Sequence, residues 1–71
     1  MTRSEQLIAL QADVDALARA DEATVLAALP RWDSLAILLV ISHFEHVHDR
    51  EISGAQVRAC RTVSDLLDLL T

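Results

Sequence analysis

The sequence predicts a small all-α domain, a bundle of three longer helices and one short helix within residues 1–71. Only one glycine and one proline occur in the chain, so long stretches contain no strong helix breaker. Apolar residues make up 52% of the chain and recur at three- and four-residue intervals, as on one face of a helix. Together these features predict a single folded helical domain rather than a disordered chain.

Charge and cysteine content narrow the classes of partner and compartment. The formal net charge is −5 and the chain contains no lysine, which argues against a nucleic acid or an anionic membrane as the partner. A partner with a basic surface is compatible with this charge. Cys60 is the single cysteine, so no internal disulfide forms, and we expect a reducing, cytoplasmic location. The longest uncharged apolar run, from Leu35 to Phe44, is too short to cross a bilayer.

The first helix is expected from Arg3 to Ala18. Thr2 and Glu5 stand at the spacing of a capping box, which predicts the helix start. Apolar residues then recur on one predicted face: Leu7, Leu10, Val14 and Leu17.

Residues 19–31 have two interpretations. A further turn of helix would bury Val25, Leu26 and Leu29, and would have to end before Pro30, which restricts the preceding residue to extended conformations. Alternatively, the segment is a long loop laid across the bundle and pinned by the same three side chains. Composition alone favours the helix.

The second helix is predicted to begin at Ser34, with Asp33 as its N-cap, and to run to His48 or Asp49. Trp32 and Ile37 have the spacing of a hydrophobic staple, which fixes the angle at which a loop enters a helix. The predicted core face consists of Leu35, Leu38, Ile41 and Phe44, with Val40 and Val47 beside it.

Two more capping boxes predict the remaining helices. Ser53 with Gln56 opens a short third helix whose apolar residues are Val57 and Cys60. Thr62 with Asp65 opens a fourth helix that continues to the C-terminus, with an apolar face of Val63, Leu66, Leu67 and Leu70.

The serine at the start of the second helix is the candidate site. Its hydroxyl projects from the positive end of the helix dipole, where backbone N–H groups favour an anion. Ser34 is therefore well placed to carry a phosphate ester. The plain alternative is that Asp33 and Ser34 are only a capped helix start.

Several motifs resemble the phosphopantetheine-binding family of acyl and peptidyl carrier proteins. Asp33-Ser34-Leu35 resembles the family's attachment motif at the start of its second helix. Later landmarks fall at the family's spacing without a gap: Glu45, Glu51-Ile52, Thr62-Val63 and Asp65-Leu66. The N-terminal half is similar only in outline, as an amphipathic helix followed by a long loop.

The resemblance implies a carrier rather than an enzyme, with 4′-phosphopantetheine attached covalently to Ser34. It implies that Asp33 caps the helix and presents the serine to a phosphopantetheinyl transferase that uses coenzyme A and Mg²⁺. It also implies that Leu35 anchors the helix start in the core. Acyl, aminoacyl or polyketide intermediates would ride on the arm as thioesters, with tethering raising their effective concentration.

Departures from the family pattern lie beside the serine. Trp32 resembles carriers of specialised polyketide or nonribosomal peptide pathways, and Ala36 and Leu39 stand where fatty-acid carriers usually have acidic residues. We therefore expect a more apolar partner surface, made of Trp32, Ala36, Ile37 and Leu39. We expect the chain to be a monomer. The resemblance implies two kinds of partner: a loading ligase or adenylation enzyme, and a ketosynthase, acyltransferase or condensation enzyme.

Two other interpretations come from the residues themselves. The chain could be a small helical interaction module without a prosthetic group, using its apolar second helix as a docking face. His43, His46 and His48 invite a metal site, but no distant further ligand is evident, so we expect no metal and interpret them as surface histidines.

Overall fold

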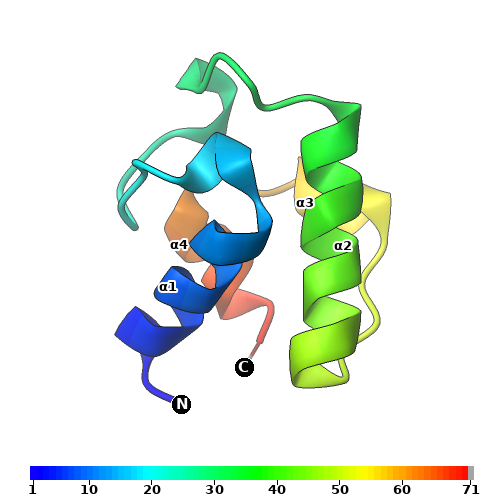
Figure 1. The fold of residues 1–71 in the computed structure, drawn as a ribbon. Helices are drawn as coiled ribbons and strands as arrows, with labels where there is room; N and C mark the ends of the chain where they lie inside the picture. Colours follow the sequence, from blue (N-terminus) through cyan, green and yellow to red (C-terminus); the bar gives the residue numbers. More distant parts are fainter. Residues whose placement is uncertain (71) are drawn as a thin grey trace.

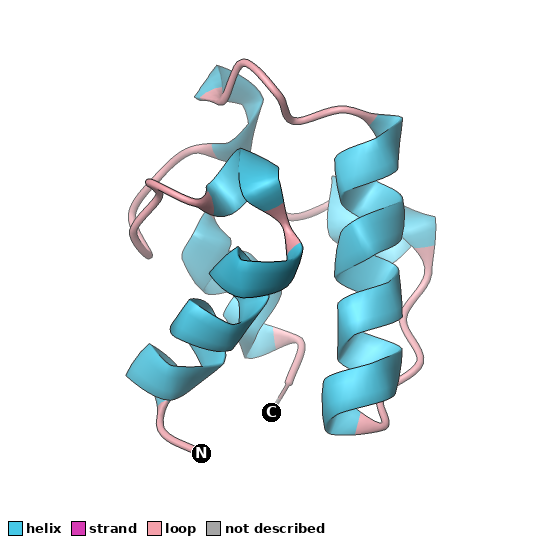
Figure 2. Ribbon diagram, in the orientation of Figure 1, coloured by secondary structure: helices cyan, strands magenta, loops and turns pink. Residues whose placement is uncertain are grey.

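The structure is a computed structural model that describes residues 1–70. This part of the chain forms four α-helices: α1 (Arg3–Asp13), α2 (Ser34–His48), α3 (Gly54–Arg58) and α4 (Val63–Asp68). Two 3-10 turns, η1 (Asp15–Leu17) and η2 (Leu26–Ala28), lie in the connection between α1 and α2. The all-α prediction is confirmed for the described residues, in which the backbone forms no strand (Figure 2).

The longest helix, α2, stands along one side of the domain and packs against α1 and α3, while α4 packs against α1 (Figure 1). Among residues 1–70, no helix has the length and apolar character needed to cross a membrane.

The three predicted capping boxes are confirmed. Thr2, Ser53 and Thr62 each accept the N–H of the residue three positions later, and each of those residues returns a side-chain oxygen to the cap N–H. These reciprocal bonds satisfy backbone donors that have no partner inside the helix. They fix the starts of α1, α3 and α4 within the local sequence.

The first helix is shorter than predicted, because it ends at Asp13 and Val14 adopts an extended conformation. Asp13, Val14 and Asp15 all have low helix propensity, so the break costs little here. The chain resumes in η1, which still buries Val14 and Leu17 completely. The Gln11 side chain donates to the carbonyls of Leu17 and Ala20, at 3.1 and 2.8 Å, and so supports the turn.

Residues 19–31 follow the loop interpretation. The helix that composition favours is wrong, and the 3-10 turn η2 stands in its place. Asp21 and Thr24 form a turn through hydrogen bonds between their side chains and nearby backbone N–H groups, which competes with helix formation. Leu26 is buried and Leu29 half-buried, as expected for pinning residues. Val25 is 41% exposed, but it pairs through its backbone with Thr62 in an isolated antiparallel bridge.

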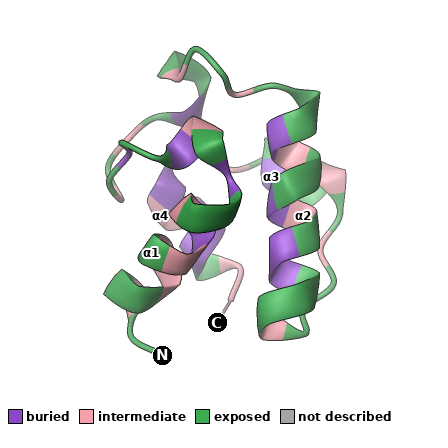
Figure 3. Ribbon diagram, viewed as in Figure 1, coloured by how far each residue is buried: buried purple, intermediate pink, exposed green. Residues whose placement is uncertain are grey.

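The second helix has the predicted bounds, but it is rotated relative to the predicted core face. Leu35 and Leu38 are 63% and 61% exposed, so their assignment to the core is wrong. The buried stripe runs instead along one side of the helix (Figure 3), through Ala36, Val40, His43 and Phe44. Its spacing of four, three and one residues is that of a helix face directed at a core.

His43 is the single charged or polar residue buried in the described part of the chain, and it is not the surface histidine that was expected. Its Nδ1 lies 2.5 Å from Oδ2 of Asp13 at the end of α1. A buried polar group needs such a partner, because losing one leaves the full cost of desolvation. The pair therefore ties the end of α1 to the middle of α2.

We predict that Asp13→Ala lowers the free energy of unfolding by about 1–3 kcal/mol, because His43 Nδ1 then has no partner in the core. Urea denaturation monitored by circular dichroism measures the change. Asp15→Ala is the matched control, since the ion pair of Asp15 with Arg31, at 3.9 Å, is exposed and its loss should leave the midpoint nearly unchanged. Equal effects of the two substitutions would contradict this role for Asp13.

Candidate functional site

The start of α2 is built by Asp33. Its backbone is extended, and its Oδ1 accepts a hydrogen bond from the N–H of Ala36 at 3.0 Å. Asp33 therefore occupies the N-cap, and Ser34 is the first residue of a helix of 15 residues. Both predictions about the local structure of this site are confirmed.

The Ser34 side chain is exposed, and within residues 1–70 its hydroxyl has no hydrogen-bond partner. The first backbone N–H groups of a helix point outward from its N-terminus, so negative charge is favourable there. His43, the histidine of α2 nearest in sequence, is nine positions along, or about 14 Å of helix. No Ser–His pair forms at Ser34, so the geometry suits a hydroxyl that receives a group rather than an activated nucleophile.

The residues expected around Ser34 differ in how far the structure buries them. Leu35 does not anchor the helix start in the core, because it lies on the exposed side of α2. Ala36 is only 3% exposed, so its assignment to a partner surface is wrong. Trp32 and Ile37 are half-buried and pack against the core, and Leu39 is 37% exposed. The apolar surface next to Ser34 therefore consists mainly of leucine side chains.

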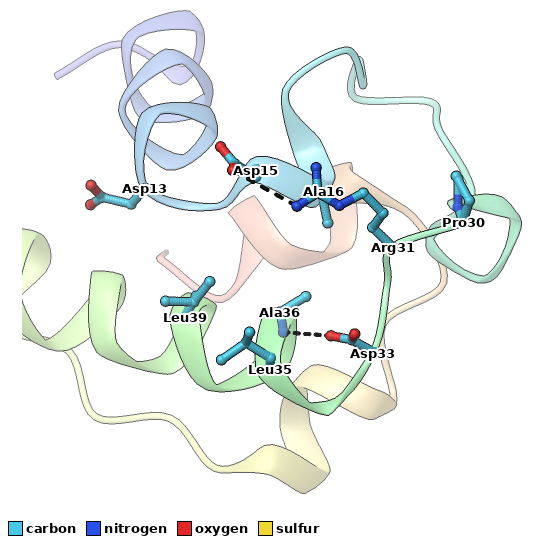
Figure 4. A pocket seen from close by; sticks show the side chains of 9 residues that line it. All are labelled: Asp13, Asp15, Ala16, Pro30, Arg31, Asp33, Leu35, Ala36 and Leu39. Atoms are coloured by element: carbon cyan, nitrogen blue, oxygen red, sulfur yellow. Dashed lines mark hydrogen bonds and ion pairs between the residues drawn. The ribbon is translucent and has the colours of Figure 1, made fainter.

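A groove of about 360 Å³ lies between the α1–η1 junction and the first turns of α2 (Figure 4). Leu35 and Leu39 project into it from α2, and Arg31 crosses it toward Asp15. The other lining residues are Asp13, Ala16, Pro30, Asp33 and Ala36. Sequence reasoning missed the wall formed by α1 and η1, because Asp13 and Asp15 reach this position only through the unpredicted end of α1.

A smaller hollow of about 250 Å³ continues along α2 and shares Asp13 and Leu39 with the groove. His43 and His46 line it together with Ser42. Within the described residues, no group of three or more histidine, cysteine, aspartate or glutamate side chains has an arrangement that could hold a metal ion.

Cys60 follows α3 and is partly buried against the core. Burial raises the pKa of its thiol, and the carboxylates of Asp65 and Asp68 raise it further. The thiol is therefore protonated at neutral pH and is a poor nucleophile. Its Sγ lies 3.3 Å from the carbonyl oxygen of Gln56, to which it donates.

In comparisons with known proteins, no family model, curated protein or solved structure matches the chain. The residues at the start of α2 thus supply the functional interpretation: an exposed hydroxyl, a helix N-terminus that favours an anion, and an adjacent groove.

We predict that Asp33→Ala lowers the free energy of unfolding by about 1 kcal/mol, because the N–H of Ala36 loses its cap. Ser34→Ala should leave the unfolding midpoint close to that of the wild type, since its hydroxyl makes no contact in the fold. Thermal and urea denaturation of both variants check the pair of outcomes. A large loss of stability in Ser34→Ala would mean that the serine has a structural role.

Proposed function

We propose that this chain is an acyl carrier protein whose Ser34 carries a covalent 4′-phosphopantetheine arm. The observation that supports this most directly is the exposed, unpartnered hydroxyl of Ser34 on the first residue of a long helix capped by Asp33. It stands in the sequence Trp32-Asp33-Ser34-Leu35, which resembles the attachment motif of carrier proteins. A bundle of the acyl-carrier type is part of the same proposal. The predicted proportions of three longer helices and one short one are not those observed, because α4 ends at Asp68 and has six residues, close to the five of α3.

The residues at the site suit such a group. Attachment forms a bond from Ser34 Oγ to the phosphorus that carries the pantetheine of coenzyme A, with release of adenosine 3′,5′-bisphosphate. The hydroxyl proton passes to a base of the transferase, because the Asp33 carboxylate, the neighbouring acid in the described residues, caps the helix at the N–H of Ala36. The resulting phosphodiester anion lies at the positive end of α2, which stabilises it. The arm's terminal thiol carries acyl groups as thioesters.

In this proposal the carrier's own role is to position Ser34 and the arm attached to it. Asp33 fixes the first turn of α2, so that Ser34 faces solvent and a transferase can reach it. The groove beside it offers apolar contacts from Leu35 and Leu39 to an arm folded along α2. Partner enzymes, such as a loading ligase, an acyltransferase, a ketosynthase or a condensation enzyme, would perform every chemical step on the cargo.

A second candidate is a helical interaction module without a prosthetic group. The observation that favours it is the exposure of Leu35 and Leu38, at 63% and 61%, on the outer side of α2. Exposed leucines in a cluster are typical of binding surfaces. Modification of Ser34 is the property that separates this candidate from the carrier.

The decisive experiment incubates the protein with coenzyme A, Mg²⁺ and a phosphopantetheinyl transferase of broad specificity, followed by intact-mass spectrometry. We expect one phosphopantetheine group per chain in the wild type and none in Ser34→Ala. Ser42→Ala is the matched control, because Ser42 is exposed on the same helix and should leave the modification intact. An unmodified wild-type protein would reject the carrier and favour the interaction module.

Docking of the transferase should depend on the leucines of α2. We predict that Leu35→Asp lowers kcat/KM for modification at least several-fold, because it places a charge in an apolar contact. Ile8→Asp is the control, since Ile8 is equally exposed, at 65%, but lies on α1. Both variants should unfold at nearly the wild-type urea concentration. If they slow the transferase equally, the leucines of α2 have no special part in docking.

A further inference from the structure

A second depression, of about 310 Å³, meets the groove beside Ser34 at Arg31. Its walls come from η1 and the residues just after it, and from the end of the connection that leads to α2. Within residues 1–70, none of its lining side chains belongs to α2. We call it the arginine pocket, because Arg19 and Arg31 both line it.

Apolar side chains form most of the lining of the arginine pocket. They are Ala16, Ala18, Leu29 and Pro30. Ala16 and Leu29 are half-buried and pack against the core, whereas Ala18 and Pro30 are exposed. A ligand that covers these side chains gains free energy, because it removes apolar surface from water. The volume is at the lower end of the range for small-molecule sites, about 300–1,000 Å³, so the pocket suits a small ligand with an apolar body.

Two guanidinium groups and one carboxylate complete the lining of the arginine pocket. They belong to Arg19, Arg31 and Asp15. The guanidinium of Arg19 has no hydrogen bond or ion pair with another residue of 1–70. Nη2 of Arg31 lies 3.9 Å from Oδ2 of Asp15, which is beyond hydrogen-bond distance. The pocket therefore carries an excess of positive charge, although the chain as a whole has a net charge of −5.

A carboxylate is the group that fits these free donors. A guanidinium presents five N–H donors in one plane, and their spacing matches the two oxygens of a carboxylate. Hydrogen bonds between two charged groups are also stronger than those between neutral groups. An inorganic anion would use the donors but leave the apolar side chains uncovered, and an alcohol would do the reverse. The lining therefore favours a ligand that combines a carboxylate with an apolar body.

We propose that the arginine pocket binds a small carboxylic acid with an apolar body, such as a short-chain aliphatic acid, in its ionised form. The carboxylate accepts hydrogen bonds from Arg19 and Arg31, and the apolar body covers Ala18, Leu29 and Pro30. The ligand is a free acid rather than a group carried on Ser34, because the lining contains no residue of α2. The inference therefore stands apart from the proposed modification of Ser34.

Asp15 is the group with which the ligand competes. Arg31 lines both the arginine pocket and the groove beside Ser34, and its side chain extends toward Asp15 (Figure 4). The two side chains are 70% and 80% exposed, so their attraction is screened by water and is weak. A bound carboxylate can therefore take the place of Asp15 beside Arg31 at little cost. Removal of the Asp15 charge should strengthen binding.

Titration of the unmodified, full chain with three probes at neutral pH tests the proposal by NMR. Hexanoate has both the charge and the apolar body, acetate has the charge with a single methyl group, and 1-hexanol has the body without the charge. We expect hexanoate to cause saturable shifts in the amide signals of residues 15–19 and 29–31, and acetate and hexanol to bind at least several-fold more weakly. Equal binding of acetate or of hexanol, or shifts that do not saturate, would overturn the proposal.

Variants provide the second arm, with hexanoate as the probe. Arg19→Gln and Arg31→Gln should each weaken binding at least several-fold, whereas Asp15→Asn should tighten it. Arg58→Gln is the matched control, because Arg58 is exposed on α3, outside the pocket, and should leave binding at the wild-type level. The gain expected for Asp15→Asn separates binding from folding, since a poorly folded variant does not bind more tightly. Weaker binding in Asp15→Asn, or equal losses in Arg19→Gln and Arg58→Gln, would also overturn the proposal.

Discussion

The rotation of α2 about its own axis is the constraint on which the rest of the structure depends. One side of the helix is buried, through Ala36, Val40 and Phe44, and these residues are 3%, 0% and 0% exposed. With that side fixed against α1 and α3, the direction of every other side chain on α2 is fixed as well. Ser34 and Leu35 must face solvent, and His43 must enter the core, because each side chain is set at about 100° from the previous one.

The same rotation joins the candidate site to the buried His43. The outer side of α2 carries the hydroxyl of Ser34 and the exposed leucines, whereas the inner side carries His43, held by Asp13 of α1. The groove beside Ser34 lies between these two sides, where α2 meets the end of α1. A change in the contact between α1 and α2 therefore reaches the surroundings of the serine, although the pair is far from it in sequence.

Local hydrogen bonding explains what could be predicted. The cap of α2 by Asp33 and the capping boxes of the other helices join residues three positions apart, so their chemistry is complete within a few residues. The starts of all four helices in residues 1–70, and the position of Ser34 on the first turn, were therefore predictable. Residues 19–31 form a loop instead of a helix, and the cause is local too: the hydrogen-bonded turn of Asp21 and Thr24 competes with helix formation.

The sequence by itself determined the all-α class, the helix starts and the placement of Ser34 at a helix N-terminus. Only the tertiary structure decided which side of α2 is buried, since leucine, valine and alanine on both sides give nearly equal helical patterns. It also decided the early end of α1 and the burial of His43. The burial of His43 depends on Asp13, a residue 30 positions away. Contacts of that range are set by how the elements pack, and no local pattern encodes them.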